Sequence, residues 1–280
     1  MTRKISAIVV SMLIGLSPVF SQSSIRGQND TLTEEVSYFL FNLMYNTNNS
    51  VGQIDQTTNI STTLGDVSFY HKSGAWVSLM PAVYSDALEF SYDVDASAGY
   101  QYFFQNGFDV NIYYQYHFYD GDSAFMGIDY QHSLNASAGY TFRRFYLYSD
   151  FYSLHGTEVN YFANTGLGYY YNWSIGKTGK WSLSIFPMLS MGMGTDFWLY
   201  QQLTSTEKAT LISDIGQEGY KTETFDFQSM DVIIPISLSY SNFSVGVSYL
   251  YSNTANKYKF AGMENQSGFL FSIDYTFNLK

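Results

Sequence analysis

Two patterns of polar side chains in this sequence could support chemistry. His71 and Ser73 are two residues apart, a spacing at which an imidazole can take the proton of a serine hydroxyl and prepare it to attack an ester. The other histidines, His117, His132 and His155, have no companion at the spacing of metal ligands, and the chain has no cysteine. We therefore expect no metal and no cofactor, and we expect the histidines to be structural.

The second pattern consists of acidic side chains at alternate positions of apolar, aromatic segments. Alternate side chains of a β-strand share a face, so these carboxylates and a set of tyrosines are predicted to line one wet face of a sheet. A pore lined by that face attracts cations and repels anions. The alternative is that the same side chains fill the interior and hydrogen-bond one another. The predicted acidic set is Glu89, Asp93, Asp95, Asp109, Asp129, Asp150, Asp231 and Asp274, and the predicted aromatic set is Tyr113, Tyr146, Tyr148, Tyr152 and Tyr170.

Alternation of apolar and polar residues recurs along most of the chain after Gly74 and predicts the strands that carry these side chains. A weaker pattern at 60–71 loses its phase near Gly65, where a β-bulge is expected. The segment Val36–Tyr45 is compatible with a strand or with an amphipathic helix beginning near Thr33, and the strand makes the total even. The twelve predicted strands are 36–45, 60–71, 74–84, 88–104, 108–119, 128–142, 145–154, 160–173, 181–193, 232–240, 243–251 and 267–280.

A short sequence repeat supports construction from successive hairpins. Asp95–Tyr100 reads Asp-Ala-Ser-Ala-Gly-Tyr, and Asn135–Tyr140 repeats it with Asn in the first place. The repeat reflects either shared construction or two strands meeting the same steric demand. In both cases it favours an up-and-down sheet over a Greek key.

The predicted connections alternate between short turns and longer, more polar loops. In membrane barrels the short turns face the periplasm and the long loops face outward. The longest irregular segment, 194–228, contains a helix-compatible stretch at 205–216 that Ser205 or Thr206 could cap. A loop of this length is expected to cover the mouth of the barrel or to bind a partner.

The basic residues indicate what the apolar face of the sheet meets. No predicted strand core carries Lys or Arg, whereas a soluble β-protein places lysines along its exposed strands and edges. In a membrane barrel, a Lys or Arg at the bilayer midplane costs about 2–4 kcal/mol. Aromatic residues make up 19% of the chain and gather near strand ends, as at a membrane interface. The sequence therefore predicts an all-β fold, a transmembrane up-and-down antiparallel β-barrel of twelve strands.

The beginning of the chain reads as an export signal. Arg3 and Lys4 precede a short apolar run and a small-residue stretch, which predicts a signal peptide at 1–21, an N-terminal periplasmic extension at 22–35 and a barrel at 36–280. Loss of Arg3 and Lys4 with the signal changes the formal net charge from −11 to −13, which argues against nucleic acid as a partner. Without cysteine, a lipoprotein anchor is excluded.

The final predicted strand, 267–280, carries Tyr275 and Phe277 near its end. It resembles the closing strand that outer-membrane β-barrels present to their assembly machinery. The chain as a whole resembles the single-domain outer-membrane barrels of Bacteroidota-type Gram-negative bacteria in its Phe-Ser-Gln cleavage region, its Tyr- and Asn-rich strands and this aromatic strand. The resemblance implies a location in the bacterial outer membrane, with outer-membrane lipids and the barrel assembly machinery as partners.

Three functions follow in order of preference. The first is a narrow porin or uptake channel for small cationic or neutral polar solutes, without enzymatic activity. The second is a closed structural or adhesion barrel that binds a partner through its long outer loops, 194–228 above all. The third is a lipid hydrolase, because His71 and Ser73 resemble the catalytic pair of outer-membrane phospholipases and lipid A deacylases. Gly74 replaces the Asn that usually follows the Ser, and the pair lies in a predicted periplasmic turn.

Overall fold

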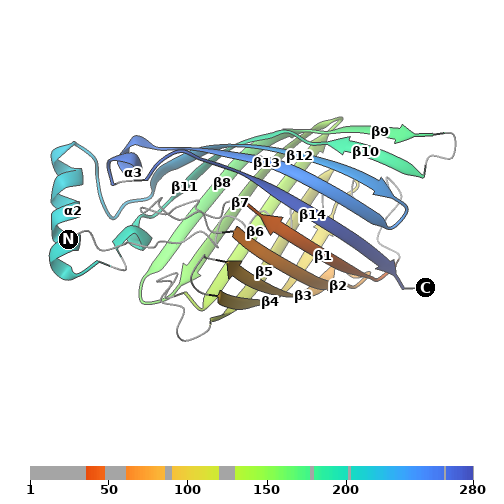
Figure 1. Cartoon of the computed structure of the whole chain (residues 1–280), viewed down its shortest axis with the longest axis horizontal. Helices are drawn as coiled ribbons and strands as arrows, with labels where there is room; N and C mark the ends of the chain where they lie inside the picture. Colours follow the sequence, from red (N-terminus) through yellow and green to blue (C-terminus); the bar gives the residue numbers. More distant parts are fainter. Residues whose placement is uncertain are drawn as a thin grey trace.

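The protein is a closed β-barrel with its helices gathered at one end (Figure 1). The computed structural model describes residues 36–47, 61–85, 90–119, 130–176, 180–200, 203–261 and 263–279. The predicted signal peptide and periplasmic extension lie outside these ranges. None of the described helices is long and apolar enough to cross a membrane.

Strands account for most of the described residues. The strand segments are β1 (Tyr38–Asn46), β2 (Ser61–Tyr70), β3 (Ala75–Ser85), β4 (Phe90–Phe103), β5 (Phe108–Tyr119), β6 (His132–Phe142), β7 (Phe145–His155), β8 (Val159–Tyr169), β9 (Tyr171–Ile175), β10 (Trp181–Ile185), β11 (Met188–Gly194), β12 (Asp226–Tyr240), β13 (Phe243–Thr254) and β14 (Gln266–Asn278). The helices are η1 (Phe197–Tyr200), α2 (Ser205–Gln217) and α3 (Asn256–Phe260).

The fourteen segments form twelve strands. β8 and β9 are one strand interrupted at Tyr170, and β10 and β11 are one strand interrupted at Phe186 and Pro187. The register is the same on both sides of the interruption, with Gly168 opposite Met188 and Tyr171 opposite Ile185. Pro187 has no N–H to donate to the ladder, which accounts for the break.

Antiparallel pairing runs around the whole barrel and closes it. Consecutive strands pair along the chain, β11 joins β8 to β12, and β1 pairs with β14 from Tyr38 opposite Asn278 to Asn46 opposite Leu270. The predicted up-and-down antiparallel barrel of twelve strands is confirmed. The strand at 36–45 is also confirmed, because β1 occupies it and no helix begins there.

The bulge expected near Gly65 is not present. Leu64 lies opposite Ala82 and Val67 opposite Leu79, so the register of β2 with β3 is unchanged across Gly65. The weak alternation at 60–71 has another cause. Pro81, on the neighbouring strand β3, packs beside Gly65 and has no backbone N–H to donate to the ladder between β2 and β3. The real shift in register lies between Gly192 and Met193, opposite the beginning of β12. That shift disturbs the alternation of β12, which begins six residues earlier than the predicted 232.

Helix α2 confirms the predicted helix, but its cap was misassigned. The N-cap is Thr204, one residue before the predicted candidates Ser205 and Thr206. The Thr204 hydroxyl accepts from the backbone N–H of Glu207 at 3.3 Å, and Glu207 accepts from the backbone N–H of Thr204 at 2.9 Å. This reciprocal capping box requires a Glu or Gln three residues after the cap, which only Thr204 has.

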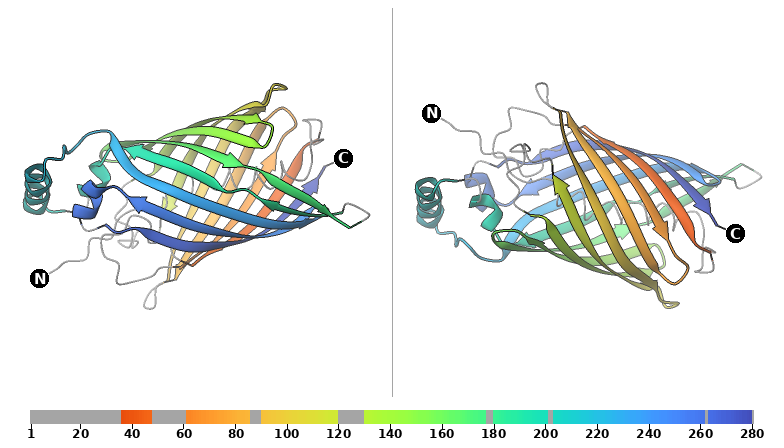
Figure 2. Two further views of the ribbon diagram at one scale, coloured as in Figure 1. Left: turned by 90° about the horizontal axis from the view of Figure 1, so that it is seen from above. Right: turned by 90° about the horizontal axis from the view of Figure 1, so that it is seen from below.

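The two ends of the barrel differ in their connections. One end, here the turn end, carries the short turns at 71–74, 104–107, 143–144 and 241–242, and the other, here the mouth, carries η1, α2 and α3. Figure 2 shows the helices beyond the mouth and the β9–β10 hairpin projecting beyond the turn end.

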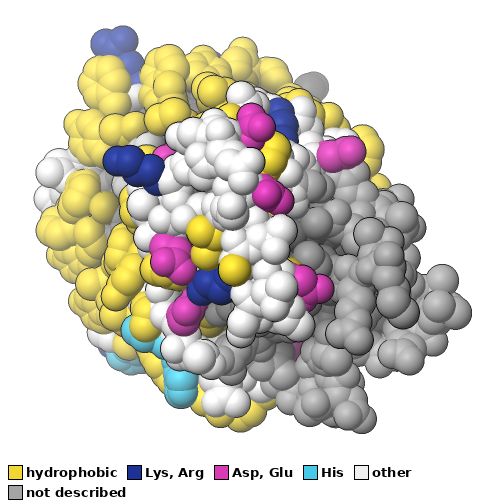
Figure 3. All heavy atoms as spheres, turned by 90° about the vertical axis from the view of Figure 1, so that its left-hand side faces the viewer, with side chains coloured by type: hydrophobic (Ala, Val, Ile, Leu, Met, Phe, Trp, Pro, Cys, Tyr) yellow, Lys and Arg dark blue, Asp and Glu magenta, His cyan; other side chains and the backbone are white. Residues whose placement is uncertain are grey.

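The outer face of the wall is apolar and aromatic. Outward side chains such as Ile112, Leu147 and Phe271 are exposed, while their inward neighbours are buried or partly buried. The described strands contain no Lys and no Arg. Seen from the mouth, hydrophobic side chains surround much of a polar, charged centre (Figure 3). A wall that presents apolar side chains outward and encloses the polar ones is built for a lipid bilayer.

A lysine on the outer wall tests this orientation. Ile112, near the middle of β5, is 57% exposed, and Ile112→Lys should lower the free energy of unfolding in lipid vesicles by about 2–4 kcal/mol, because the ammonium group must enter hydrocarbon. Denaturant titration of the folded protein measures the change. Thr206→Lys on the exposed surface of α2 is the control and should have little effect. A loss below about 0.5 kcal/mol, as at an ordinary water-exposed position, would contradict a lipid-facing wall.

Candidate functional site

One side of the barrel lumen, formed by β4 to β7, is polar. Asp93, Asp95 and Asp109 are buried, and their neighbours in sequence alternate toward the outer face. Asp95 lies opposite His117 in register, and the His117 Nδ1 atom is 2.5 Å from the Asp95 Oδ1 atom. This side of the lumen therefore carries inward-facing carboxylates.

Glycines on the inner face let aromatic rings lie flat against this part of the wall. A Cβ on Gly99 would come within 2.8 Å of Trp76, and a Cβ on Gly139 would overlap the ring of Tyr146. Tyr146 on β7 therefore reaches across Gly139 on β6, and its hydroxyl donates to Asp109 Oδ1 on β5 at 3.2 Å. Gly99 and Gly139 occupy the same place in the repeated Ala-Gly-Tyr sequence. The repeat thus meets the same steric demand on two strands.

The rest of the lumen is less polar than the alternation predicted. Apolar side chains from β1 to β3, from β7 and from β10 to β14 point inward and pack into one layer, here the apolar layer. A lumen enclosed by twelve strands is narrow enough for inward side chains from different strands to meet. The predicted uniformly wet face is therefore interrupted at this level. The apolar layer consists of Met44, Leu64, Met80, Ala82, Tyr148, Phe186, Met188, Ile233, Leu250 and Leu270, with Tyr146 and Tyr170 packed against it.

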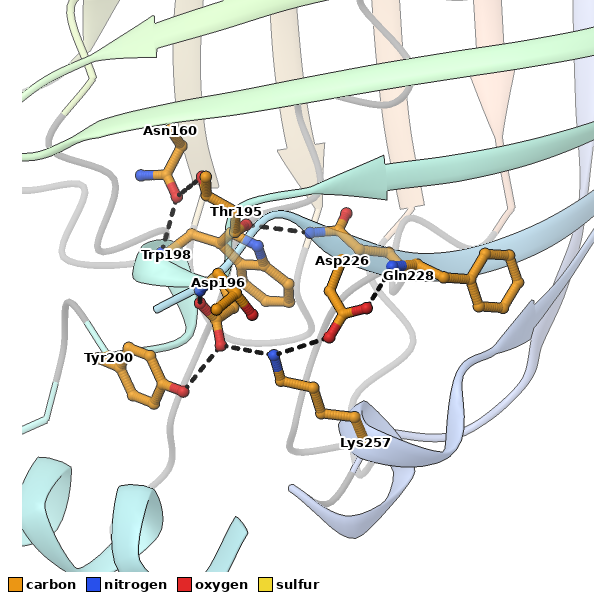
Figure 4. A network of polar contacts seen from close by, with 10 residues as sticks. Asn160, Thr195, Asp196, Trp198, Tyr200, Asp226, Gln228 and Lys257 are labelled. Atoms are coloured by element: carbon orange, nitrogen blue, oxygen red, sulfur yellow. Dashed lines mark hydrogen bonds and ion pairs between the residues drawn. The ribbon is translucent and has the colours of Figure 1, made fainter. Parts of the chain in front are cut away.

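The segment that follows β11 is held at the mouth by a buried ion pair (Figure 4). Asp196 is 0% exposed, and its Oδ2 atom is 2.9 Å from Lys257 Nζ of α3. The same Lys257 Nζ is 3.6 Å from Asp226 Oδ2 at the beginning of β12. The Tyr200 hydroxyl of η1 donates to Asp196 Oδ2 at 3.0 Å. One lysine thus ties three segments of the mouth together.

Neutral hydrogen bonds attach this segment to the wall. The side-chain oxygen of Asn160 on β8 accepts from the Thr195 hydroxyl and from the Trp198 backbone N–H, each at 3.1 Å. Gln228 Nε2 donates to the Thr195 carbonyl at 3.0 Å. Around these bonds packs an apolar cluster that includes Leu199 and residues of α2 and α3. We call the assembly of η1, α2 and α3 the mouth cap.

The tyrosines of the mouth cap lie outside the strands, and their ionisation is suppressed. Burial, and next the negative charge of Asp196, raise the pKa of the Tyr200 phenol above its usual range. Burial and the same carboxylate raise the pKa of the Tyr258 phenol. Both phenols therefore stay neutral in the folded mouth cap.

The structure places most of the predicted site residues on the inner wall. Asp93, Asp95, Asp109 and Asp274 are buried there, as are Tyr113, Tyr148 and Tyr152, while Asp150, Asp231, Tyr146 and Tyr170 are partly buried. Glu89 and Asp129 lie outside the described residues. That these side chains line the path of a solute stays a prediction.

The remaining sequence candidates are separate from the lumen. The rings of Tyr275 and Phe277 point outward from β14, and their role in assembly stays a prediction. His71 Nδ1 is 2.8 Å from Ser73 Oγ, but both residues are exposed in the 71–74 turn and the Ser73 backbone N–H also donates to His71. These contacts belong to a turn. Within the described ranges, no group of three or more His, Asp and Glu side chains is arranged to hold a metal.

Sequence reasoning missed Asp66, Asp196 and Lys257. Asp66 on β2 points into the lumen, but the weak alternation around Gly65 concealed which face it occupies. Asp196 and Lys257 are far apart in the sequence, in segments read only as loops, and nothing in their local pattern predicts their contact. The alternation of the neighbouring strand β1 could have shown that Asp66 faces inward, because Asn42 on β1 lies opposite Asp66.

Comparisons with known proteins give matches among solved structures at low sequence identity. No protein-family model and no curated protein sequence matches the chain. Among solved structures, LpxR from Salmonella typhimurium is 9% identical with a TM-score of 0.46, covering 85% of this chain and 99% of its own. The translocator domain of autotransporter NalP from Neisseria meningitidis is 9% identical with a TM-score of 0.45, covering 96% of each chain. A KdgM porin is 9% identical with a TM-score of 0.42, covering 85% and 98%.

At these identities, function has to be argued from the residues of this chain. The location follows from the wall itself, which is closed, apolar outside, polar in part inside and free of Lys and Arg in its described strands. The chain is an outer-membrane β-barrel.

Removal of the mouth lysine tests the ion pair. Lys257→Met keeps the apolar stem but leaves Asp196 buried without its counter-charge, an imbalance that costs about 3–5 kcal/mol in proteins. The mouth cap should open, so that a protease cuts within 203–225 while the barrel itself resists digestion. Lys259→Met is the matched control, because the Lys259 ammonium is near the surface and bonds the neutral side-chain oxygen of Asn253. Equal digestion of the two variants would show that the ion pair does not hold the cap.

Alkaline pH should also loosen the mouth cap. The phenols of Tyr200 and Tyr258 have a raised pKa in the folded state, so their contribution to stability is complete below the unfolded pKa of about 10 and is lost as the pH rises above it. Digestion within 203–225 should therefore increase between pH 8 and pH 11. Tyr200→Phe should reduce this pH dependence, whereas Tyr220→Phe, at an exposed position, should preserve it. A pH-independent digestion rate would contradict the assignment.

Proposed function

We propose that the barrel is a narrow, cation-selective channel for the uptake of small cationic or neutral polar solutes. The observation that carries the proposal is the charge of the wall, since the described strands contain eight Asp and no Lys or Arg. Inside a low-dielectric wall, these carboxylates favour cations and disfavour anions. The proposal includes no enzymatic step.

The apolar layer and the mouth cap support a restricted passage and argue against a wide porin. Ring and methionine side chains meet in the apolar layer, which leaves room for small solutes at most. The mouth cap lies at the end from which an external solute arrives, if the short turns face the periplasm as in other membrane barrels. Release of the mouth cap would therefore be a step in uptake.

Bilayer recordings test the channel directly. Full-length folded protein in a planar bilayer under a KCl gradient should give stable steps whose reversal potential has the sign of cation selectivity. Asp95→Asn and Asp109→Asn should each reduce the ratio of K⁺ to Cl⁻ permeability several-fold, because each removes a buried inward charge. Asp214→Asn, on the exposed surface of α2, is the control and should leave the ratio unchanged.

The Lys257→Met variant gives a second, independent reading. If the mouth cap restricts entry, this variant should increase the conductance or the open time without changing ion selectivity. Silence from correctly folded wild-type protein and from Lys257→Met would remove the channel. The folded, polar exterior of the mouth cap would then favour the second function, a closed barrel that binds a partner through 194–228.

A further inference from the structure

Three inward-facing residues lie side by side on neighbouring strands of the lumen wall. Asn42 on β1 is opposite Asp66 on β2 and also opposite Asp274 on β14. Their sequence neighbours Val67 and Ile273 are exposed on the outer face, so the carboxylates point inward. Directly opposed residues on one face of an antiparallel pair have Cβ atoms about 4.5–5.5 Å apart. Two carboxylates therefore flank one amide.

Serine hydroxyls hold the two carboxylates in matching ways. Asp66 Oδ1 accepts from Ser68 Oγ at 2.8 Å and from Ser78 Oγ at 2.5 Å. Asp274 Oδ2 accepts from Ser244 Oγ at 3.1 Å and from Ser272 Oγ at 3.4 Å. In each case both bonds go to one carboxylate oxygen, which fixes the group without consuming the other oxygen.

The amide between the carboxylates gives an independent indication of a ligand. Asn42 is 8% exposed, and its side-chain oxygen has no hydrogen-bond partner. A buried acceptor without a donor is costly, and most buried polar groups have partners. Asp66 and Asp274 also repel each other electrostatically, and the described strands supply no Lys or Arg to offset them. The register thus places an amide with an unpartnered oxygen between two carboxylates, and the described strands put no positive side chain beside them.

We propose that Asp66, Asn42 and Asp274 form a binding site for a divalent, oxygen-seeking cation of the Ca²⁺ type. Ca²⁺ takes carboxylate and amide oxygens together with waters in a flexible arrangement of six to eight ligands, and two carboxylates match its charge. The site lies just below Met44 and Leu64 of the apolar layer, on the side of the turn end. It deepens the proposed function and rests on it in one respect, that ions reach the lumen.

Calorimetric titration of Ca²⁺ into the folded full-length protein, in detergent with 100 mM NaCl, tests the site. Wild type should bind one Ca²⁺, and Asp66→Asn, Asp274→Asn and Asn42→Leu should each lower the affinity at least tenfold. Asp231→Asn is the matched control. Asp231 is an inward carboxylate that also accepts from a serine, Ser229 at 3.0 Å, but its register partners are Ser190 and Ser252 and not a second carboxylate. The Asp231→Asn variant should therefore bind Ca²⁺ with the affinity of wild type.

A thermal measurement keeps the proposal testable if a variant fails to fold. Ca²⁺ bound only by the folded state raises the unfolding temperature of wild type, and an equal ionic strength of NaCl should not. Absence of Ca²⁺ binding in wild type, or equal binding in all four variants, would overturn the site. If Ca²⁺ binds but the protein gives no conductance in bilayers, the channel proposal fails and the site proposal stands. If the protein gives cation-selective conductance but does not bind Ca²⁺, only the site proposal fails.

Discussion

The pairing of β1 with β14 is the interaction on which the rest of the molecule depends. A bilayer offers no water to the peptide N–H and C=O groups, so a sheet can lie in it only when every edge is paired. The ladder from Tyr38 with Asn278 to Asn46 with Leu270 closes the last edge. Closure also fixes the register around the ring and therefore decides which side chains meet inside. The neighbours of Asn42 are a consequence of that closure.

Closure with twelve strands divides the side chains by environment. Outside, lipid accepts any apolar residue, so the wall needs no detailed packing there. Inside, the bore is narrow, so side chains from distant parts of the sequence contact one another and must pack together. The apolar layer and the polar wall of β4 to β7 share this space. Charge in the bore is therefore uneven, because carboxylates gather on some strands and apolar side chains on others.

The sequence predicted the barrel and the faces of its strands well, because the two-residue periodicity and the absence of Lys and Arg can be recognised within each strand separately. It predicted less where contacts join distant residues. The ion pair of Asp196 with Lys257 and the apolar layer depend on closure, which no local pattern contains. Asp66 was missed because Gly65 and Pro81 blur the alternation of β2, and the cap of α2 was missed by one residue because Glu207 was not considered as its reciprocal partner.

The glycines beneath the inward rings have a mechanical consequence. At Gly139, the ring of Tyr146 lies against bare backbone, and its hydroxyl donates a hydrogen bond to Asp109. The same ring also packs against Tyr148 and Phe186, so its position is set by contacts with several strands. A methyl group added at Gly139 would displace the ring toward the bore, which makes the free cross-section of the barrel sensitive to one backbone position.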